Sequence, residues 1–121
     1  MGGRIASLAA DEAGVDGLIC LGYPFHPVGK PTQLRTEHLK TLVTPTLIVQ
    51  GDRDALGTKA EVQAFSLAPS IRFVWMKDGD HSFKPRKSSG RTQDENLRAA
   101  VDAIVDFLDR PAKTEVKNPG P

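Results

Sequence analysis

Three short apolar runs, each ending in a polar or glycine-containing loop, limit what this chain can fold into. They are residues 17–22, 46–50 and 71–76. Continuous apolar runs of this length between turn residues are typical of strands buried on both faces of a sheet. The third run alternates between two faces, with Phe73 on one and Val74 on the other. The sequence therefore predicts three strands of a covered sheet.

Helical segments separate the predicted strands, at about 2–13, 35–42, 58–67 and 94–108. The last is the longest, and its apolar residues recur at helical spacing. They are Leu97, Val101, Ile104, Val105 and Leu108. We expect this stripe to face the core. Alternating helices and strands imply parallel strands joined by right-handed crossovers, so the predicted fold class is α/β with about three parallel strands flanked by helices.

Length and composition predict one domain and exclude several classes of protein. The 121 residues suit a single core over 1–110, and the proline-containing polar segment 111–121 is predicted to be a disordered tail. With 16 basic and 15 acidic residues the net charge is +1, which gives no general attraction to nucleic acid or membranes. The single cysteine, Cys20, excludes an internal disulfide and is expected to be buried. Because the chain shows neither a leader nor an apolar run of about 20 residues, we expect a cytoplasmic protein.

Two polar loops follow neighbouring predicted strands and carry the best candidates for chemistry. The loop after 46–50 contains Asp52 and Asp54, and the loop after 71–76 contains His81. Neighbouring parallel strands lie about 4.8 Å apart, so these side chains can meet at one edge of the sheet. An aspartate that orients a histidine is two-thirds of a catalytic triad. Asp54 is the preferred acid, with Asp52 as the alternative.

The first residues, Met1-Gly2-Gly3, look like the helix side of a nucleophile elbow whose serine would directly precede Met1. Met1 would then follow the nucleophile, and its backbone N–H would be the first oxyanion donor. Neither Ser7 nor Ser82 is expected on a strained strand-to-helix turn, so neither replaces that serine.

Three segments together resemble one branch of the α/β-hydrolases. They are Gly-Tyr-Pro-Phe-His-Pro, Pro-Thr-Leu-Ile-Val-Gln-Gly-Asp-Arg-Asp and Asp-Gly-Asp-His-Ser-Phe. They are similar to the dienelactone-hydrolase-like branch, which includes the testis-expressed type and the third subunit of the NSL complex. The resemblance covers about residues 1–108 and only the C-terminal half of that domain, without its early strands or elbow serine. It implies that Asp54 is the acid and His81 the general base.

The resemblance leaves two functions open. One is serine hydrolysis of carboxylic esters or lactones, for which this chain retains acid and base but not the nucleophile. The alternative is a noncatalytic, partner-binding remnant, in which the strand at 17–22 becomes an exposed edge that invites self-association. No cofactor, nucleic-acid partner or membrane partner is expected in either case.

Other polar residues give weaker signals. His26 and His38 lack partners at metal-ligand spacing, and the turn containing Asp78 and Asp80 has no second cluster, so no metal site is predicted. A basic run follows the histidine and is expected to be solvated, with binding of an anionic group as the alternative. Its members are Lys84, Arg86, Lys87 and Arg91.

Overall fold

The computed structural model describes residues 10–12, 14–26, 29–30, 32 and 34–109. Its elements, in chain order, are β1 (Leu18–Leu21), η1 (Glu37–Lys40), β2 (Thr46–Gly51), α2 (Lys59–Gln63), β3 (Ile71–Met76), η2 (Lys87–Ser89) and α3 (Gln93–Leu108). Met1 and the predicted tail 111–121 lie outside the described residues. So does most of the predicted first helix, of which residues 10–12 are described as helical.

The three strands form one parallel sheet in the order β1-β2-β3, so the predicted fold class is confirmed. In the register, Cys20 lies beside Ile48, and Ile48 lies beside Phe73. Every residue of the central strand β2 is buried, as its apolar centre, Leu47 to Val49, predicts. The carboxyl ends of all three strands therefore meet at one edge of the sheet.

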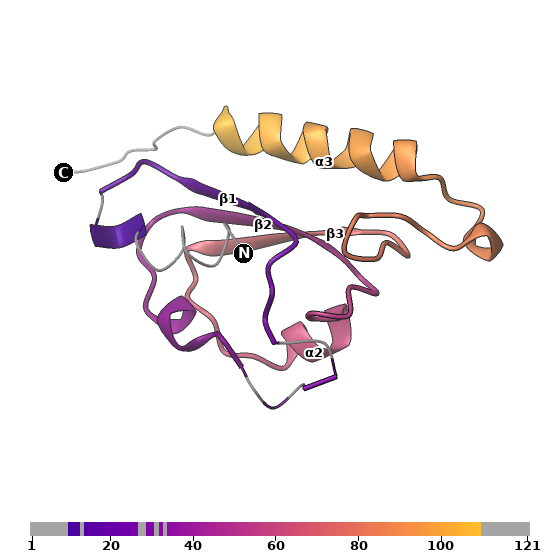
Figure 1. Cartoon of the computed structure of the whole chain (residues 1–121). Coiled ribbons are helices and arrows are strands. Elements are labelled where there is room, and N and C mark those ends of the chain that lie inside the picture. The colour runs from indigo at the N-terminus through magenta and orange to yellow at the C-terminus, as the bar shows by residue number, and fades with distance from the viewer. Residues whose placement is uncertain (1–9, 13, 27–28, 31, 33, 110–121) are drawn as a thin grey trace.

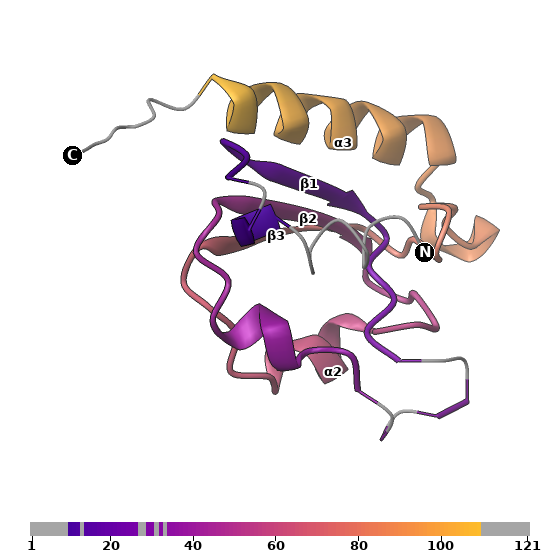
Figure 2. The same ribbon diagram turned by 60° about the vertical axis from the view of Figure 1, so that its left-hand side comes forward.

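Helices cover the two faces of the sheet unequally. Helix α3 lies over one face, and η1 and α2 lie under the other (Figures 1 and 2). On the α3 face, Val49 and Met76 pack with Ala100 and Phe107. On the opposite face, Ile48 packs in a second cluster whose members from outside the sheet include Tyr23, Phe25, Leu39 and Val62. The predicted alternation of Phe73 and Val74 between the two faces is confirmed.

The prediction that the apolar stripe of α3 faces the core is wrong. The side chains that α3 buries are Asn96, Ala100 and Phe107. Four members of the predicted stripe are exposed, namely Leu97, Val101, Val105 and Leu108, and Ile104 is half-buried. The helix docks through small alanines beside Phe107, which let its backbone approach the sheet closely. Hydrophobic spacing identified the helix but not which of two adjacent faces it buries.

The shorter helical segments are also less extensive than predicted. The segment 35–42 contains only the 3₁₀ turn η1, and 58–67 contains only the five-residue α2. Helix α2 begins at a capping box, in which the Thr58 hydroxyl accepts from the backbone N–H of Glu61 and the Glu61 carboxylate accepts from the Thr58 N–H. Thr92 and Glu95 start α3 in the same way.

Strand β1 lies at the edge of the described sheet and is not buried on both faces as predicted. Leu18 and Cys20 are buried against the η1 side, whereas Leu21 is 58% exposed. Burial raises the pKa of the Cys20 thiol to about 11, so this cysteine is a packing residue, as expected. Within the described residues, no helix is both long and apolar enough to cross a bilayer.

Candidate active site

Asp54 and His81 meet at the carboxyl edge of the sheet. Oδ2 of Asp54 lies 2.8 Å from Nδ1 of His81, although the two residues are 27 positions apart. The Asp54 side chain is completely buried, and the imidazole is about half exposed (51%). Because an ionised carboxylate only accepts hydrogen bonds, this contact places the ring proton on Nδ1 and leaves Nε2 as the acceptor. His81 thus has one nitrogen anchored to a buried acid and the other available for proton transfer.

The turn after β2 fixes the acid. The Asp54 backbone N–H donates to Gly51 O at 3.1 Å, and Asp54 O accepts from the Gly57 N–H at 3.0 Å. Its second carboxylate oxygen, Oδ1, accepts from the Leu56 N–H at 2.8 Å. Both carboxylate oxygens therefore have a partner, which is needed to hold a buried carboxylate in one orientation.

Main-chain hydrogen bonds join the turn after β2, which carries Asp54 and which we call the acid turn, to the loop after β3, which carries His81 and which we call the histidine loop. The Asp52 N–H donates to Met76 O at 3.2 Å, and the Arg53 N–H donates to Gly79 O at 2.9 Å. Gly51 sits where the two segments approach each other closely, because a Cβ at this position would overlap the Gly79 carbonyl. The close approach of the two loops thus depends on a glycine at the end of β2.

Strand β1 contributes a third wall of the site through Gly22. This glycine has a φ of +76° and donates its N–H to Val49 O at 2.8 Å. A Cβ there would lie 2.9 Å from His81 Cε1 and 3.1 Å from Nδ1. Gly22 therefore makes room for the imidazole, and only glycine adopts this backbone conformation without strain.

Gln50, the residue before Gly51, joins the β1 loop to the acid turn. Its side chain is completely buried. Oε1 accepts from the Tyr23 N–H at 2.7 Å, and Nε2 donates to Tyr23 O at 3.1 Å and to Gly57 O at 3.2 Å. A glutamine at the end of a buried strand whose centre is apolar is the sequence signal that identifies this role.

An ion-pair network braces the histidine loop from outside. Arg86 Nη2 lies 2.6 Å from Asp78 Oδ1, and the Arg86 N–H donates to Asp78 Oδ2 at 2.8 Å. Arg53 Nε donates to Asp78 O at 3.0 Å. The bonds from Arg86 lower the pKa of Asp78 to about 2. Asp78 adopts a φ of +55°, a conformation that aspartate tolerates better than most residues.

Two further side chains hold the loop from inside. Asp80 Oδ1 accepts from the backbone N–H groups of Ser82 and Lys84, so Asp80 stabilises the turn. Asn96 of α3 is completely buried. Its Nδ2 donates to Lys77 O at 3.0 Å and to Phe83 O at 2.8 Å, on either side of His81. Helix α3 therefore helps to position the histidine.

The other residues considered from the sequence, Asp52, His26 and His38, are not part of the pair formed by Asp54 and His81. In the described part of the chain no hydrogen bond joins Asp52 to His81, so the structure pairs His81 with Asp54 instead. His26 contacts Glu61 at 3.1 Å, and His38 contacts the Tyr23 hydroxyl at 3.2 Å. Among the described residues, no group of three or more potential metal ligands occurs.

The basic run is not simply solvated. Arg86 binds Asp78, and Arg91 Nε donates to Asn96 Oδ1 at 2.9 Å. These two arginines therefore brace the histidine loop, a role that charge alone did not indicate. Met1, the predicted oxyanion donor, lies outside the described residues.

A comparison with protein families decides the identity of this fold. The family described as the alpha/beta hydrolase domain matches residues 1–109, which is most of the chain. The chain belongs to the α/β-hydrolase family. No solved structure was found to match it. In α/β-hydrolases the triad follows the chain order serine, acid, histidine, and in this α/β-hydrolase Asp54 and His81 have the order and strand-end positions of the last two members.

The contact with Asp54 leaves the second ring nitrogen of His81, Nε2, without a described partner. In the part of the chain that the structure describes, Nε2 makes no hydrogen bond, and none joins the Ser82 hydroxyl to the imidazole. An imidazole held at Nδ1 and open at Nε2 can accept a proton from a hydroxyl nucleophile. Catalysis by Asp54 and His81 remains a prediction.

Proposed function

We propose that this α/β-hydrolase domain supplies the acid and base of a serine hydrolase that cleaves carboxylic esters or lactones. The observation that carries the proposal is the 2.8 Å contact between the buried Asp54 carboxylate and His81 Nδ1. A solvated turn aspartate would have no reason to be completely buried, because burying a carboxylate is costly unless a specific partner compensates.

The residues suit a two-step acyl transfer. His81 Nε2 removes the proton from a serine hydroxyl as Oγ attacks the carbonyl carbon of the ester, and Asp54 stabilises the imidazolium that forms. The imidazolium then protonates the leaving alcohol as the bond from carbon to that oxygen breaks. Water, deprotonated by the same Nε2, hydrolyses the acyl-serine and regenerates the hydroxyl.

The proposal assigns the serine to the position directly before Met1, with the Met1 N–H as the first oxyanion donor. Its support is the likeness of Met1-Gly2-Gly3 to the helix side of an elbow, together with the chain order of the triad. We also propose the dienelactone-hydrolase-like branch, on the three resembling segments. That branch would favour small esters or lactones as substrates.

Activity-based labelling tests the catalytic proposal. We expect a form extended upstream through the elbow serine to react with a fluorophosphonate probe and to hydrolyse p-nitrophenyl acetate. His81→Ala should abolish labelling, and Asp54→Asn should slow it by about 10³–10⁴-fold, as loss of the correct tautomer does in related triads. Ser82→Ala is the control and should label normally. A folded extended form that does not label would refute the proposal.

A second candidate, a noncatalytic partner-binding domain, is supported by a different observation. Four aliphatic side chains of α3 are exposed on one flank, from Leu97 at 44% to Leu108 at 67%. Contiguous exposed apolar surface marks interaction sites in soluble proteins. This candidate predicts a partner for that flank whether or not the triad works.

A further inference from the structure

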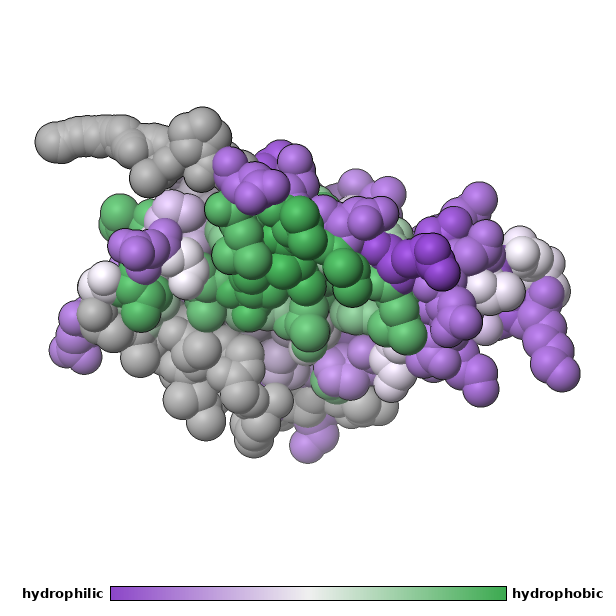
Figure 3. Space-filling view, turned by 90° about the horizontal axis from the view of Figure 1, so that it is seen from above, coloured by the Kyte–Doolittle hydropathy of each residue, from purple (hydrophilic) through white to green (hydrophobic). Residues whose placement is uncertain are grey.

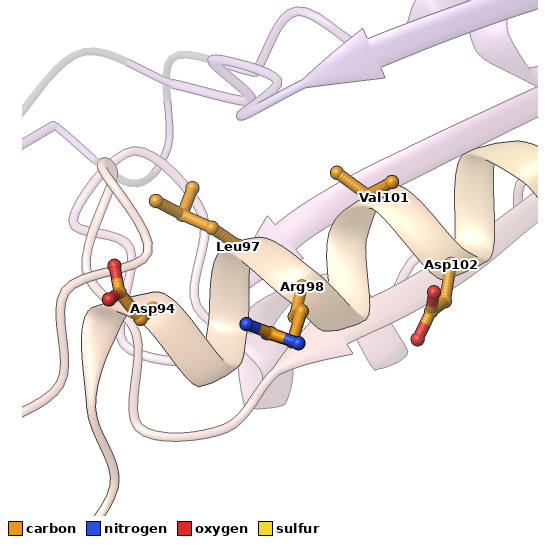
Figure 4. A pocket seen from close by; sticks show the side chains of 5 residues that line it. All are labelled: Asp94, Leu97, Arg98, Val101 and Asp102. Carbon is orange, nitrogen blue, oxygen red and sulfur yellow. The ribbon is translucent and has the colours of Figure 1, made fainter.

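Surfaces that this chain exposes can be covered by other segments of an α/β-hydrolase domain or by a separate partner. One is the hydrophobic area on the α3 side of the molecule (Figure 3). Another is a shallow groove of about 390 Å³ along α3 (Figure 4), lined by Asp94, Leu97, Arg98, Val101 and Asp102. A contact that is already buried between described residues does not depend on such cover. One contact of this kind joins the loop after β1 to the acid turn.

The loop after β1 reaches the acid turn and α2 through His26. The His26 backbone N–H donates to Leu56 O at 3.1 Å, and the ring Nε2 lies 3.1 Å from Oε1 of Glu61. The His26 side chain is only 4% exposed. His26 is thus bonded to the acid turn through its main chain and to the first turn of α2 through its ring.

Both partners of His26 lead to the segment that holds the acid. Leu56, whose carbonyl accepts from His26, donates its own N–H to Oδ1 of Asp54 at 2.8 Å. Glu61, the partner of the ring, forms the capping box with Thr58 and so fixes the start of α2. The chain from the acid to α2 is therefore bonded to His26 at two places.

One oxygen of Glu61 accepts these bonds. Oε1 accepts from the Thr58 N–H at 3.0 Å and from the Thr58 hydroxyl at 3.2 Å, and it faces His26 Nε2. The Thr58 N–H, followed by the His26 ring, lowers the pKa of Glu61, so the group is an ionised acceptor at neutral pH. Because a carboxylate only accepts, His26 Nε2 carries a proton, whereas His81 carries its proton on Nδ1.

The other contacts that hold this part of the chain meet at Gly57. A Cβ there would lie 2.5 Å from Cδ2 of Phe25, so the two residues are closely packed, and Gln50 Nε2 donates to Gly57 O at 3.2 Å. A turn that is held at one residue can rotate about it. The bonds of His26 to Leu56 and Glu61, one on each side of Gly57, remove that freedom.

We propose that His26 is a positioning residue for the triad, whose bond to Glu61 holds the acid turn where Asp54 meets His81. The effect on hydrolysis rests on the proposed function. The effect on the pair itself does not, because the contact between Asp54 and His81 is a property of the folded chain. The bond to Leu56 comes from the main chain, so a side-chain substitution of His26 removes the bond to Glu61 and leaves the main-chain bond in place.

Two amide variants test the proposal by NMR on the chain itself. In His26→Gln the amide nitrogen lies as many bonds from Cα as the imidazole Nε2 and can still donate to Glu61, whereas in His26→Asn it lies one bond closer and falls short. We expect His26→Asn to move the two ¹⁵N signals of the His81 ring toward each other, as the tautomers mix, and His26→Gln to retain the original signals.

His38→Asn is the matched control, because it removes the 3.2 Å contact with the Tyr23 hydroxyl in the same loop and leaves the acid turn untouched. It should leave the His81 signals unchanged. Circular dichroism shows whether each variant is folded. If His26→Asn does not fold, Glu61→Gln weakens the same contact while keeping a residue suited to the capping box, and it should move the His81 signals in the same direction.

Kinetics of the form extended through the elbow serine measure the effect on hydrolysis. His26→Asn should lower kcat for p-nitrophenyl acetate about tenfold or more and leave KM within about twofold, since a displaced acid and base weaken contacts made only in the transition state. His26→Gln should restore kcat to within about twofold of the original.

The two measurements separate this proposal from the catalytic one. His81 signals that are unchanged in a folded His26→Asn, or that change equally in His26→Asn and His26→Gln, would overturn the role of His26. An extended form that does not hydrolyse esters, while its His81 signals still respond to the bond with Glu61, would refute the proposed function and support the positioning role.

Discussion

Among the described residues, one carboxylate, that of Asp54, holds the His81 ring by a hydrogen bond. Because Nδ1 lies 2.8 Å from the buried Asp54, the neutral ring should carry its proton on Nδ1. In Asp54→Asn we expect this tautomer to lose its dominance, since an amide can donate to the ring as well as accept from it. The ¹⁵N chemical shifts of the two ring nitrogens at alkaline pH measure the tautomer directly.

Asp52→Asn is the control for that measurement, because Asp52 lies two residues away and makes no hydrogen bond to the ring in the described structure. It should leave both ¹⁵N shifts unchanged. If Asp52→Asn changed the tautomer and Asp54→Asn did not, the acid would be Asp52.

Asp78 gives the histidine loop a defined dependence on pH. Hydrogen bonds from Arg86 lower its pKa from 3.8 to about 2. An acid with a lowered pKa in the folded state adds stability that is complete above its unfolded pKa and is lost as the pH falls through the folded one. We therefore expect Asp78→Asn to be less stable than the original at pH 6, with the difference shrinking between about pH 4 and pH 2.

Urea unfolding at several pH values measures the effect, with Asp106→Asn as the control because Asp106 lies on the exposed side of α3. A difference between Asp78→Asn and the original chain that stays constant down to pH 2 would contradict the assignment.

Asn96 is the principal link between α3 and the histidine loop. Asn96→Ala leaves the carbonyls of Lys77 and Phe83 without their donor, and the bond to Phe83 is buried. We expect it to lower the free energy of unfolding by about 1–3 kcal/mol, the usual cost of an unsatisfied buried group. Hydrogen exchange should accelerate most in residues 77–91, because both released contacts anchor that segment.

Gln93→Ala is the matched control, since Gln93 donates to Ser82 O in the same loop but from an exposed position. Its effect should stay within about 0.5 kcal/mol. Equal losses in the two variants would show that Asn96 acts only through helix formation.

The sequence predicted the elements of the sheet well and their packing less well. The strands at 46–50 and 71–76 could be predicted because a parallel strand that is covered on both faces needs a nearly continuous run of apolar residues. The core face of α3 could not, because small residues such as Ala100 dock a helix as effectively as Leu97 does, and hydrophobic spacing gives the larger residue more weight. Only coordinates show which face the sheet occupies.

The candidate site was predictable in part for the same kind of reason. The parallel topology brought the loops of Asp54 and His81 together, and their spacing in the sequence was enough to expect it. The contributions of Gly22 and Asn96 were not predicted. Both depend on the tertiary structure, which brings Gly22 close to the imidazole and places Asn96 within hydrogen-bond distance of the Phe83 carbonyl.

Among the described residues, the hydrogen bonds that hold Asp54 and His81 come from the turn after β2, the loop after β3 and Asn96 of α3. In the proposed triad, the acid and the base would therefore be positioned by other segments than the one that carries the serine. A substitution that removed the serine hydroxyl would then abolish the proposed hydrolysis and leave the contact between Asp54 and His81 in place.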